Sequence, residues 1–384
     1  MTGWWAVAAL GAERDARDVE RMFDTIEARY AYLDPQRTDL QGCRDRWIPA
    51  ARAATTHAER VGVFEQVLEA LVDSHATLGT NLPSSTRLVP SALDTWGELA
   101  GPGLVVSAVR PGWPADRAGV RPGDVIVAVN GTPAPERVQA RIGPCVRADD
   151  PEVQRWAALV VLAGTHDTPR VWTLADGRTL TLDDPDEMPA REPVTVTTTP
   201  DGFVVVALHQ LGDSATIRAF DAALEQARAA PGLVIDLRDT AAGGSTTVAE
   251  PVLGRFVSER TAYQRIVPTR GEAWDRRVSP RGPWTWDGPV VVVADRWTGS
   301  MGEGMALGCD AIGVPVVGTP MAGLKGAVHT FRTRSGVSWN LPTDRLQHVD
   351  GTPRERWVPP ALVPVDGTGD PVLERAVERL RQGR

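Results

Sequence analysis

Apolar residues within the first 80 positions recur at helical spacing. Met22, Phe23 and Ile26 lie on one such stripe, and a second run with the same spacing covers residues 61–71. Apolar positions three and four residues apart line one face of an α-helix, the face that packs against a core. The pattern predicts an N-terminal helical region over residues 1–88, ended by a polar loop.

The chain begins with an apolar stretch at residues 4–12 that ends in small residues. It lacks the positive charges that precede the apolar core of a signal peptide, and it is short for one. The stretch fits either the remnant of a trimmed signal or the plain start of a helix, and we favour the helix. No run along the chain approaches the ~20 apolar residues of a membrane span, so we expect no stable membrane insertion.

From residue 89 onward the pattern changes to short β-type runs. Runs such as 104–106 are apolar and are separated from the next by Pro-Gly turns. A helix is expected near 151–163, and a hairpin that turns on an Asp-Gly pair is expected over 171–182. We therefore predict a small β domain over 89–187.

From residue 188 onward, strand-like and helix-like segments alternate. The expected strands are 203–208, 233–237, 289–294 and 314–317, and the expected helices are 215–229, 302–310 and 370–382. Such alternation indicates a mostly parallel sheet with crossover helices. The fold class predicted for the whole chain is α+β and multidomain, with an α/β domain over 188–384.

Composition limits the classes of function. The 384 residues are 42% hydrophobic and 23% charged, which is ordinary for two or three globular domains. The formal charge is -8 and the basic residues form no patch, so we expect no nucleic-acid partner. The histidines include no HxxxH pair and the cysteines form no zinc-type motif, so we expect no metal or other cofactor.

Three widely spaced cysteines, Cys43, Cys145 and Cys309, cannot all pair with one another. Structural disulfides follow an oxidising compartment, which nothing in the sequence establishes. We expect free thiols and keep a Cys43–Cys145 bridge as the alternative.

The middle segment has turn glycines and apolar positions in a characteristic order. Residues 100–106 read AGPGLVV, residues 109–115 read VRPGWPA, and residues 118–126 read AGVRPGDVI. This order closely resembles the PDZ domain of bacterial proteases. PDZ domains add an extended peptide to a sheet edge and capture its carboxylate with backbone N–H groups.

The resemblance implies that peptide capture takes place at the turn of Gly101, Gly103 and Leu104. Pro102 has no backbone N–H, so this loop has one donor fewer than usual. The domain is therefore either a peptide-binding module or a structural spacer.

The strand expected at 233–237 runs into a charged turn and a glycine pair, and residues 236–244 read DLRDTAAGG. They resemble the Asp-Leu-Arg and Asn-Pro-Gly-Gly segment of the carboxyl-terminal processing (tail-specific) proteases, family S41. Ala241 and Ala242 replace the Asn and Pro. In that family a glycine amide of this turn helps to form the oxyanion hole, which implies Gly243 and Gly244 here.

A second stretch places Ser300 between a strand and a helix, and residues 291–303 read VVVADRWTGSMGE. Ser300 with Glu303 matches the family's nucleophile motif, and it also matches a helix capping box. A helix N-terminus offers free N–H groups and the positive end of a dipole, so Met301 is expected to join the oxyanion hole. The resemblance identifies Ser300 as the nucleophile.

Two residues compete for the role of general base, and the first is Lys325. It follows Ser300 at the separation found in tail-specific proteases, and it is the only lysine among 41 basic residues. Arginine cannot give up its proton at workable cost, whereas lysine can. The family reads Gly-Lys-Gly where this chain has Leu324 between Gly323 and Lys325, a shift that could turn the lysine away from Ser300.

The second candidate is His75, which follows Ser74 at the end of the helical region. The two resemble the Ser-His pair of the tricorn-type branch of the same superfamily, where a late glutamate completes the site. Glu355 matches that glutamate. Histidine accepts protons near neutral pH, and a carboxylate partner would fix its tautomer. The choice stays open between Lys325 and His75 with Ser74 and Glu355.

The resemblance covers most of the chain and implies a serine peptidase with a crotonase-like domain over 188–384. It would hydrolyse unstructured or C-terminal peptide segments through an acyl-enzyme. Tail-specific relatives work in the bacterial envelope, which is the expected compartment if residues 1–12 are a signal remnant; otherwise the cytoplasm is expected. The alternatives are a binding protein that has lost catalysis and an enzyme acting on acyl thioesters. The oligomeric state stays open.

Overall fold

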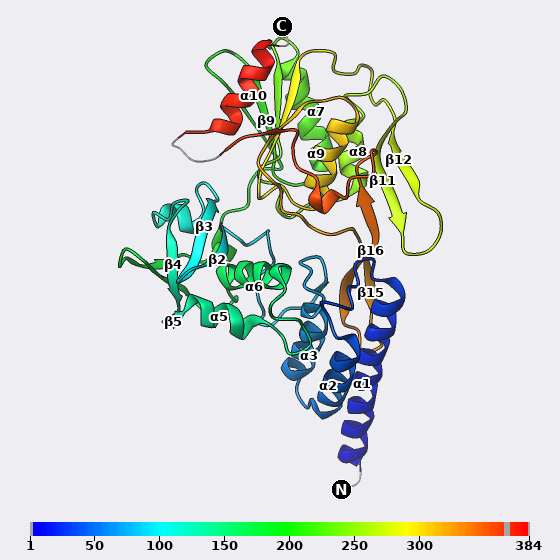
Figure 1. Ribbon diagram of the computed structural model, residues 1–384. Helices are drawn as coiled ribbons and strands as arrows, with labels where there is room; N and C mark the ends of the chain where they lie inside the picture. The colour runs from blue at the N-terminus through cyan, green and yellow to red at the C-terminus, as the bar shows by residue number, and fades with distance from the viewer. Residues whose placement is uncertain (1–2, 365–368, 383–384) are drawn as a thin grey trace. The chain divides into compact units, whose positions relative to one another are not determined.

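The computed structural model describes residues 3–364 and 369–382, and the chain folds into two compact units (Figure 1). Unit 1 consists of Met1–Met188 with Gly326–Asp344, and unit 2 consists of Pro189–Lys325 with Arg345–Arg384. Unit 2 therefore begins where the α/β pattern begins. The α/β pattern of the sequence does not indicate that residues 326–344 belong to unit 1.

Three helices form the first part of unit 1, as the apolar stripes predict. They are α1 (Gly3–Arg29), α2 (Leu40–Ala53) and α3 (His57–Glu69). Residues 4–12 lie within α1. Phe23 and Phe64 are fully buried in the common core. α3 begins with a capping box, in which the N–H of Glu59 donates to Thr56 Oγ1 and the N–H of Thr56 donates to Glu59 Oε2.

A β domain follows in unit 1, with the strand order β2-β3-β4-β6-β7 and with β5 beside β4. Its strands are β2 (Thr95–Ala100), β3 (Gly103–Val109), β4 (Val125–Val129), β5 (Thr132–Pro133), β6 (Arg170–Leu174) and β7 (Thr179–Leu182). Its helices are α4 (Pro114–Arg117), α5 (Ala134–Arg141) and α6 (Pro151–Ala163). The predicted helix and hairpin are confirmed by α6 and by the β6–β7 pair.

The late segment of unit 1 is a β-hairpin. Strands β1 (Thr77–Leu78) and β15 (Ala327–Arg332) both pair antiparallel with β16 (Ser338–Gln347), which belongs to unit 1 as far as Asp344. Trp339 and Leu341 of β16 are buried in the core of α1–α3. This burial is the reason why the hairpin belongs to unit 1.

Unit 2 is built on a six-stranded sheet with the order β17-β14-β13-β10-β9-β8. Its strands are β8 (Val194–Thr198), β9 (Val204–Leu208), β10 (Leu233–Asp236), β13 (Val290–Ala294), β14 (Val316–Gly318) and β17 (Ala361–Leu362). All neighbours are parallel except β8 and β9. The predicted mostly parallel sheet is confirmed.

Helices cover both faces of this sheet. One face carries α7 (Ala215–Ala227), α8 (Thr246–Leu253) and α9 (Met301–Ala311), and the other carries α10 (Pro371–Gln382). Val292 and Ala294 pack towards α7–α9, whereas Val291 and Val293 pack towards α10. Because both faces are covered, the strands read as continuous apolar runs. Two antiparallel strands, β11 (Thr261–Pro268) and β12 (Trp274–Val278), complete unit 2.

Within the described residues, no helix is long and apolar enough to cross a bilayer. The same part of the chain contains no group of three or more His, Cys, Asp or Glu side chains that could hold a metal ion. Cys43, Cys145 and Cys309 are buried and free, so the alternative bridge is not formed.

Candidate active site

Ser300 occupies the turn between β13 and α9, at the carboxyl edge of the parallel sheet, where open α/β sheets bind their ligands. It is the N-cap residue of α9, with φ 52 and ψ -109. Residues other than glycine rarely adopt positive φ, and those that do concentrate at functional sites. Among the described residues, Val72, Asn130 and Ser300 are the non-glycine residues with positive φ.

The glycine turn after β10 lies directly against Ser300. A Cβ atom added to Gly243 would lie 2.4 Å from the Cβ of Ser300 and 2.9 Å from its Oγ. Gly243 has φ 69, so another residue there would be strained as well as blocked. The same added atom would lie 3.2 Å from the backbone N of Met301. Three residues that the sequence predicts as parts of one site are therefore neighbours.

The amides around Ser300 are not equivalent. The N–H of Gly243 donates to the carbonyl of Thr240 at 2.8 Å and closes the turn that contains Ala241 and Ala242. Met301 opens α9, where the first N–H groups of a helix have no partner within the helix. Gly243 thus allows the backbone of this turn to lie close to Ser300, while its own N–H is already hydrogen-bonded within the turn.

Glu303 is fully buried one helical turn after Ser300. Its Oε2 accepts the N–H of Ser300 at 2.8 Å. Its Oε1 accepts the N–H of Gly323 at 2.8 Å and that of Leu324 at 3.2 Å. Burial raises the pKa of this carboxyl to about 7, although a neighbouring guanidinium and the backbone N–H groups act in the opposite direction. The side chain of Glu303 therefore joins the turn that contains Ser300 to the segment at 323–324.

The neighbouring guanidinium belongs to Arg354, which is 3% exposed in the short 3-10 helix Arg354–Arg356. Its terminal nitrogens donate to the carbonyl of Ser300 at 3.2 Å and to that of Leu324 at 2.9 Å. Neither role is visible in the sequence, where Glu303 matches an ordinary capping residue and Arg354 is one arginine among many. Burial is the signal that distinguishes them, and it depends on the tertiary structure.

Lys325 directly follows Leu324 and is half-buried. Gly323 has φ 73, and a Cβ atom added to it would lie 3.4 Å from the carbonyl oxygen of Glu355. Glu355 is itself half-buried. The segment that leads to Lys325 is therefore bound to the nucleophile turn through a carboxylate and packs beside the backbone of Glu355.

Ser74 and His75 lie in unit 1, after α3, and both are half-buried. The N–H of His75 donates to Asp73 Oδ1 at 2.9 Å, and the hydroxyl of Tyr30 donates to Asp73 Oδ2 at 2.8 Å. Val72 has φ 51, which is a costly conformation for a β-branched residue. A buried aspartate thus holds the turn that presents His75 within unit 1.

Gly101, Gly103 and Leu104 lie at the turn and start of the β2–β3 hairpin. β3 has β2 along one edge and β4 along the other, and Leu104 is fully buried. β4 pairs with Leu104 and Val105 of β3, and β2, as the terminal strand, has the outer edge of the hairpin. Peptide capture at the Gly101–Leu104 turn stays a prediction.

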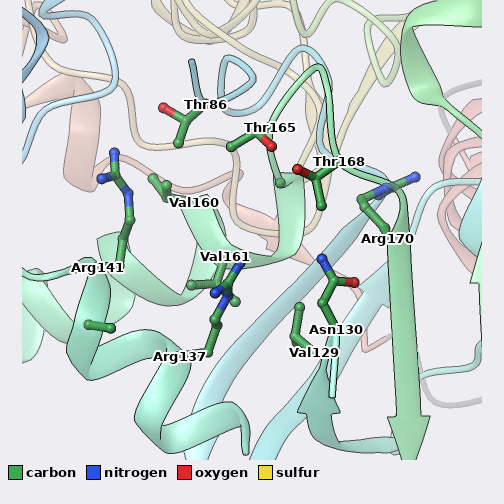
Figure 2. A pocket seen from close by; sticks show the side chains of 12 residues that line it. Thr86, Val129, Asn130, Arg137, Arg141, Val160, Val161, Thr165, Thr168 and Arg170 are labelled. Atoms are coloured by element: carbon green, nitrogen blue, oxygen red, sulfur yellow. The ribbon is translucent and has the colours of Figure 1, made fainter. Parts of the chain in front are cut away.

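A pocket of about 170 Å³ lies in the same domain between α5, α6, β4 and β6 (Figure 2). Figure 2 shows Arg137, Arg141 and Arg170 around it. Arg170 donates to both carboxylate oxygens of Asp94, at 2.7 and 2.9 Å, and Arg141 pairs with Glu69. These carboxylates neutralise two of the three arginines.

Comparison with protein families matches two segments of the chain. Residues 203–361 match the model of peptidase family S41, and residues 105–153 match a PDZ domain model. HhoA of Synechocystis sp., a protein that bears a serine-protease name, is 39% identical over 83 residues. This similarity spans 22% of the present chain and 18% of that relative's length.

Solved structures share the fold over nearly the whole chain. The photosystem II D1 C-terminal processing protease has a TM-score of 0.58 and 20% identity, covering 95% of this chain and 96% of that chain. Mature CPAF has a TM-score of 0.61 and 12% identity, covering 97% of each chain. At these identities the likeness concerns the fold alone.

Proposed function

Because residues 203–361 match the model of peptidase family S41, we propose that this protein is a serine endopeptidase acting through Ser300. It would cleave unstructured or C-terminal peptide segments. The proposal rests chiefly on the contact between Gly243 and the Ser300 side chain, at the start of α9. There a hydroxyl lies beside backbone amides at the positive end of a helix dipole, which suits an oxygen that becomes negative.

In the proposed reaction, Ser300 Oγ attacks the carbonyl carbon of the scissile bond while a base takes its proton. We assign the developing oxyanion to the N–H groups of Met301 and Gly244, since the N–H of Gly243 is engaged with Thr240. Collapse of the tetrahedral intermediate breaks the C–N bond, and the leaving amine takes the proton from the base. Water then hydrolyses the ester on Ser300 and restores the hydroxyl.

The contacts within unit 2 favour Lys325 as the base. Glu303 accepts hydrogen bonds from Ser300 and from Leu324, so Lys325 follows directly after a residue that shares an anchor with the nucleophile. The inserted Leu324 buries its side chain, which accommodates the one-residue departure from the family pattern.

The second arrangement uses His75 as the base, with Ser74 and Glu355 as its partners. Asp73 holds the backbone of His75, and the strained Val72 precedes it, which is the pattern of a functional turn. For the PDZ-like domain, we assign peptide presentation to the outer edge of β2 and the Gly101–Leu104 turn.

Hydrolysis of casein and labelling by a fluorophosphonate test the nucleophile. We expect Ser300→Ala to lose both and Ser214→Ala to keep both. Ser214 is a matched control because it is also the N-cap residue of a helix in unit 2 and is exposed. Equal hydrolysis by wild type and Ser300→Ala would end the mechanism. A wild type that neither cleaves nor labels would favour a binding protein, and activity on coenzyme A thioesters alone would favour that reaction.

Substitutions at the two candidates distinguish the bases. Lys325→Arg keeps the positive charge but removes a group that can release its proton. If Lys325 is the base, kcat falls by at least about 100-fold in Lys325→Arg and much less in His75→Gln. The opposite result, with a matching loss in Glu355→Gln, selects the histidine arrangement.

A further inference from the structure

Two buried side chains of unit 2 bind the same two backbone segments. Glu303 accepts the N–H of Ser300 at 2.8 Å and that of Leu324 at 3.2 Å. Arg354 donates to the carbonyl of Ser300 at 3.2 Å and to the carbonyl of Leu324 at 2.9 Å. Ser300 and Leu324 are therefore each held at both backbone polar groups, by one carboxyl group and one guanidinium.

We infer that Glu303 and Arg354 form a clamp that positions the nucleophile turn and the segment of Lys325 relative to each other, an inference that rests on the proposed peptidase function. Strained backbone persists only where its surroundings over-determine it. Ser300, at φ 52, has its N–H bound by Glu303 and its carbonyl bound by Arg354 and by the N–H of Gly304 at 3.1 Å. The clamp thus maintains the positive-φ conformation of Ser300.

The burial of both charged groups supports a positioning role. Glu303 is 0% exposed and Arg354 is 3% exposed. Buried charges are costly, and an apolar pair of similar volume is often at least as stable, so such groups are weak evidence for stability. Glu303 and Arg354 are instead placed where only a two-oxygen acceptor and a forked donor can satisfy two segments at once.

Glu303→Gln tests the clamp with little change in volume. A glutamine has one acceptor oxygen, and its NH2 group would face either the N–H of Ser300 or the N–H groups of Gly323 and Leu324. One half of the clamp must then open. Glu303→Asp restores two oxygens on a shorter side chain. Arg354→Lys keeps the positive charge without the forked donors of the guanidinium. Glu59→Gln is the matched control, since Glu59 caps α3 in the same way but is exposed.

The kinetic readout is hydrolysis of dye-labelled casein. We expect kcat of Glu303→Gln to fall by at least about 100-fold with KM within about threefold, because a misplaced nucleophile lowers the chemical step rather than binding. Glu303→Asp should recover at least about tenfold, Arg354→Lys should lose about tenfold, and Glu59→Gln should stay within about twofold. A folded Glu303→Gln with wild-type kcat, or a folded Glu303→Asp no better than Glu303→Gln, would overturn the inference while leaving the Ser300 mechanism intact.

Amide hydrogen exchange gives a readout that does not depend on activity. In Glu303→Gln we expect exchange at least about tenfold faster in residues 298–301 or in residues 322–325, with the rest of unit 2 unchanged, and no such change in Glu59→Gln. If wild type proves inactive and this acceleration still occurs, the clamp stands and the proposed function fails. If exchange in both segments is unchanged, or rises throughout unit 2, the clamp is overturned whatever the activity.

Discussion

Two helices of this protein begin with the same pattern, a hydroxyl residue followed three positions later by a glutamate. Thr56 and Glu59 open α3, and Ser300 and Glu303 open α9. At both helices the glutamate carboxylate accepts the N–H of the N-cap residue. The local requirement of a helix N-terminus is thus met in the same way in unit 1 and in unit 2.

The two capping boxes differ in their surroundings. Glu59 is exposed, and the N–H groups of Thr56 and Thr55 lower its pKa to about 2. Glu303 is buried, and desolvation raises its pKa to about 7 despite the same kind of hydrogen bond. Thr56 has φ -108, which is ordinary, whereas Ser300 has φ 52. The difference shows that one local motif can begin a helix at the surface or hold a strained residue through a buried carboxyl group.

Apart from removal of the Ser300 hydroxyl itself, the largest effect is expected from closing the space beside Ser300. A methyl group in Gly243→Ala would lie 2.4 Å from the Cβ of Ser300, so kcat on casein should fall by at least about 100-fold. Gly62→Ala is the matched change inside α3, where no described atom beyond the neighbouring residues and the local helix backbone lies within 4 Å of the added Cβ. It should keep full activity and gain up to about 1 kcal/mol in the free energy of unfolding. A fully active Gly243→Ala would remove the basis for the site.

Glu303 should make the protein less stable as the pH rises. Its pKa is about 7 in the folded protein and 4.5 for an ordinary glutamate, so the folded state binds the extra proton between these values. This stabilisation, about 3 kcal/mol, is fully present below pH 4.5 and is lost as the pH rises through 7.

Urea unfolding of wild type and Glu303→Gln at about pH 5 and about pH 8 measures this effect. From the lower to the higher pH, the free energy of unfolding of the wild type should fall by most of this stabilisation, relative to the free energy of unfolding of Glu303→Gln. A difference that does not change with pH would show that Glu303 does not titrate in this range.

Replacement of the two N-cap residues should separate stability from activity. Thr56→Ala removes the acceptor of the Glu59 N–H, so the free energy of unfolding should fall by about 1 kcal/mol with hydrolysis unchanged. Ser300→Ala should abolish hydrolysis without a comparable loss of stability. Thermal melts and casein hydrolysis measure both quantities, and a destabilised Ser300→Ala with residual activity would make Ser300 chiefly a cap.

The smallest effect, and one of opposite sign, is expected from Glu59. Because its pKa is lowered to about 2, its contribution is present above pH 4.5 and is lost as the pH falls through about 2. Glu59 is exposed to solvent, so the shift in Tm should be small. The advantage of wild type over Glu59→Gln in thermal melts should shrink in acid. An advantage that grows in acid would contradict the assignment of Glu59 as an ionised cap.

Periodicity was sufficient to predict most of the elements, because the spacing of apolar residues reports which face of a helix or strand is buried. The helix at 151–163 and the parallel strands of unit 2 follow from it. The return of 326–344 to unit 1 does not, since no local pattern says which distant core Trp339 will fill. The strand neighbours of β3 were hidden for the same reason.

For the candidate site too, some features follow from the local sequence and others only from the tertiary structure. By itself, the sequence determined the order of elements, the resemblance that makes Ser300 the candidate nucleophile, and the capping pattern that begins α9, because each depends on residues close together in the chain. Only the tertiary structure decided that Gly243 touches Ser300, that Glu303 loses its solvent and that Arg354 joins it. Burial and contact depend on segments far apart in sequence, and desolvation changes what the same carboxylate does.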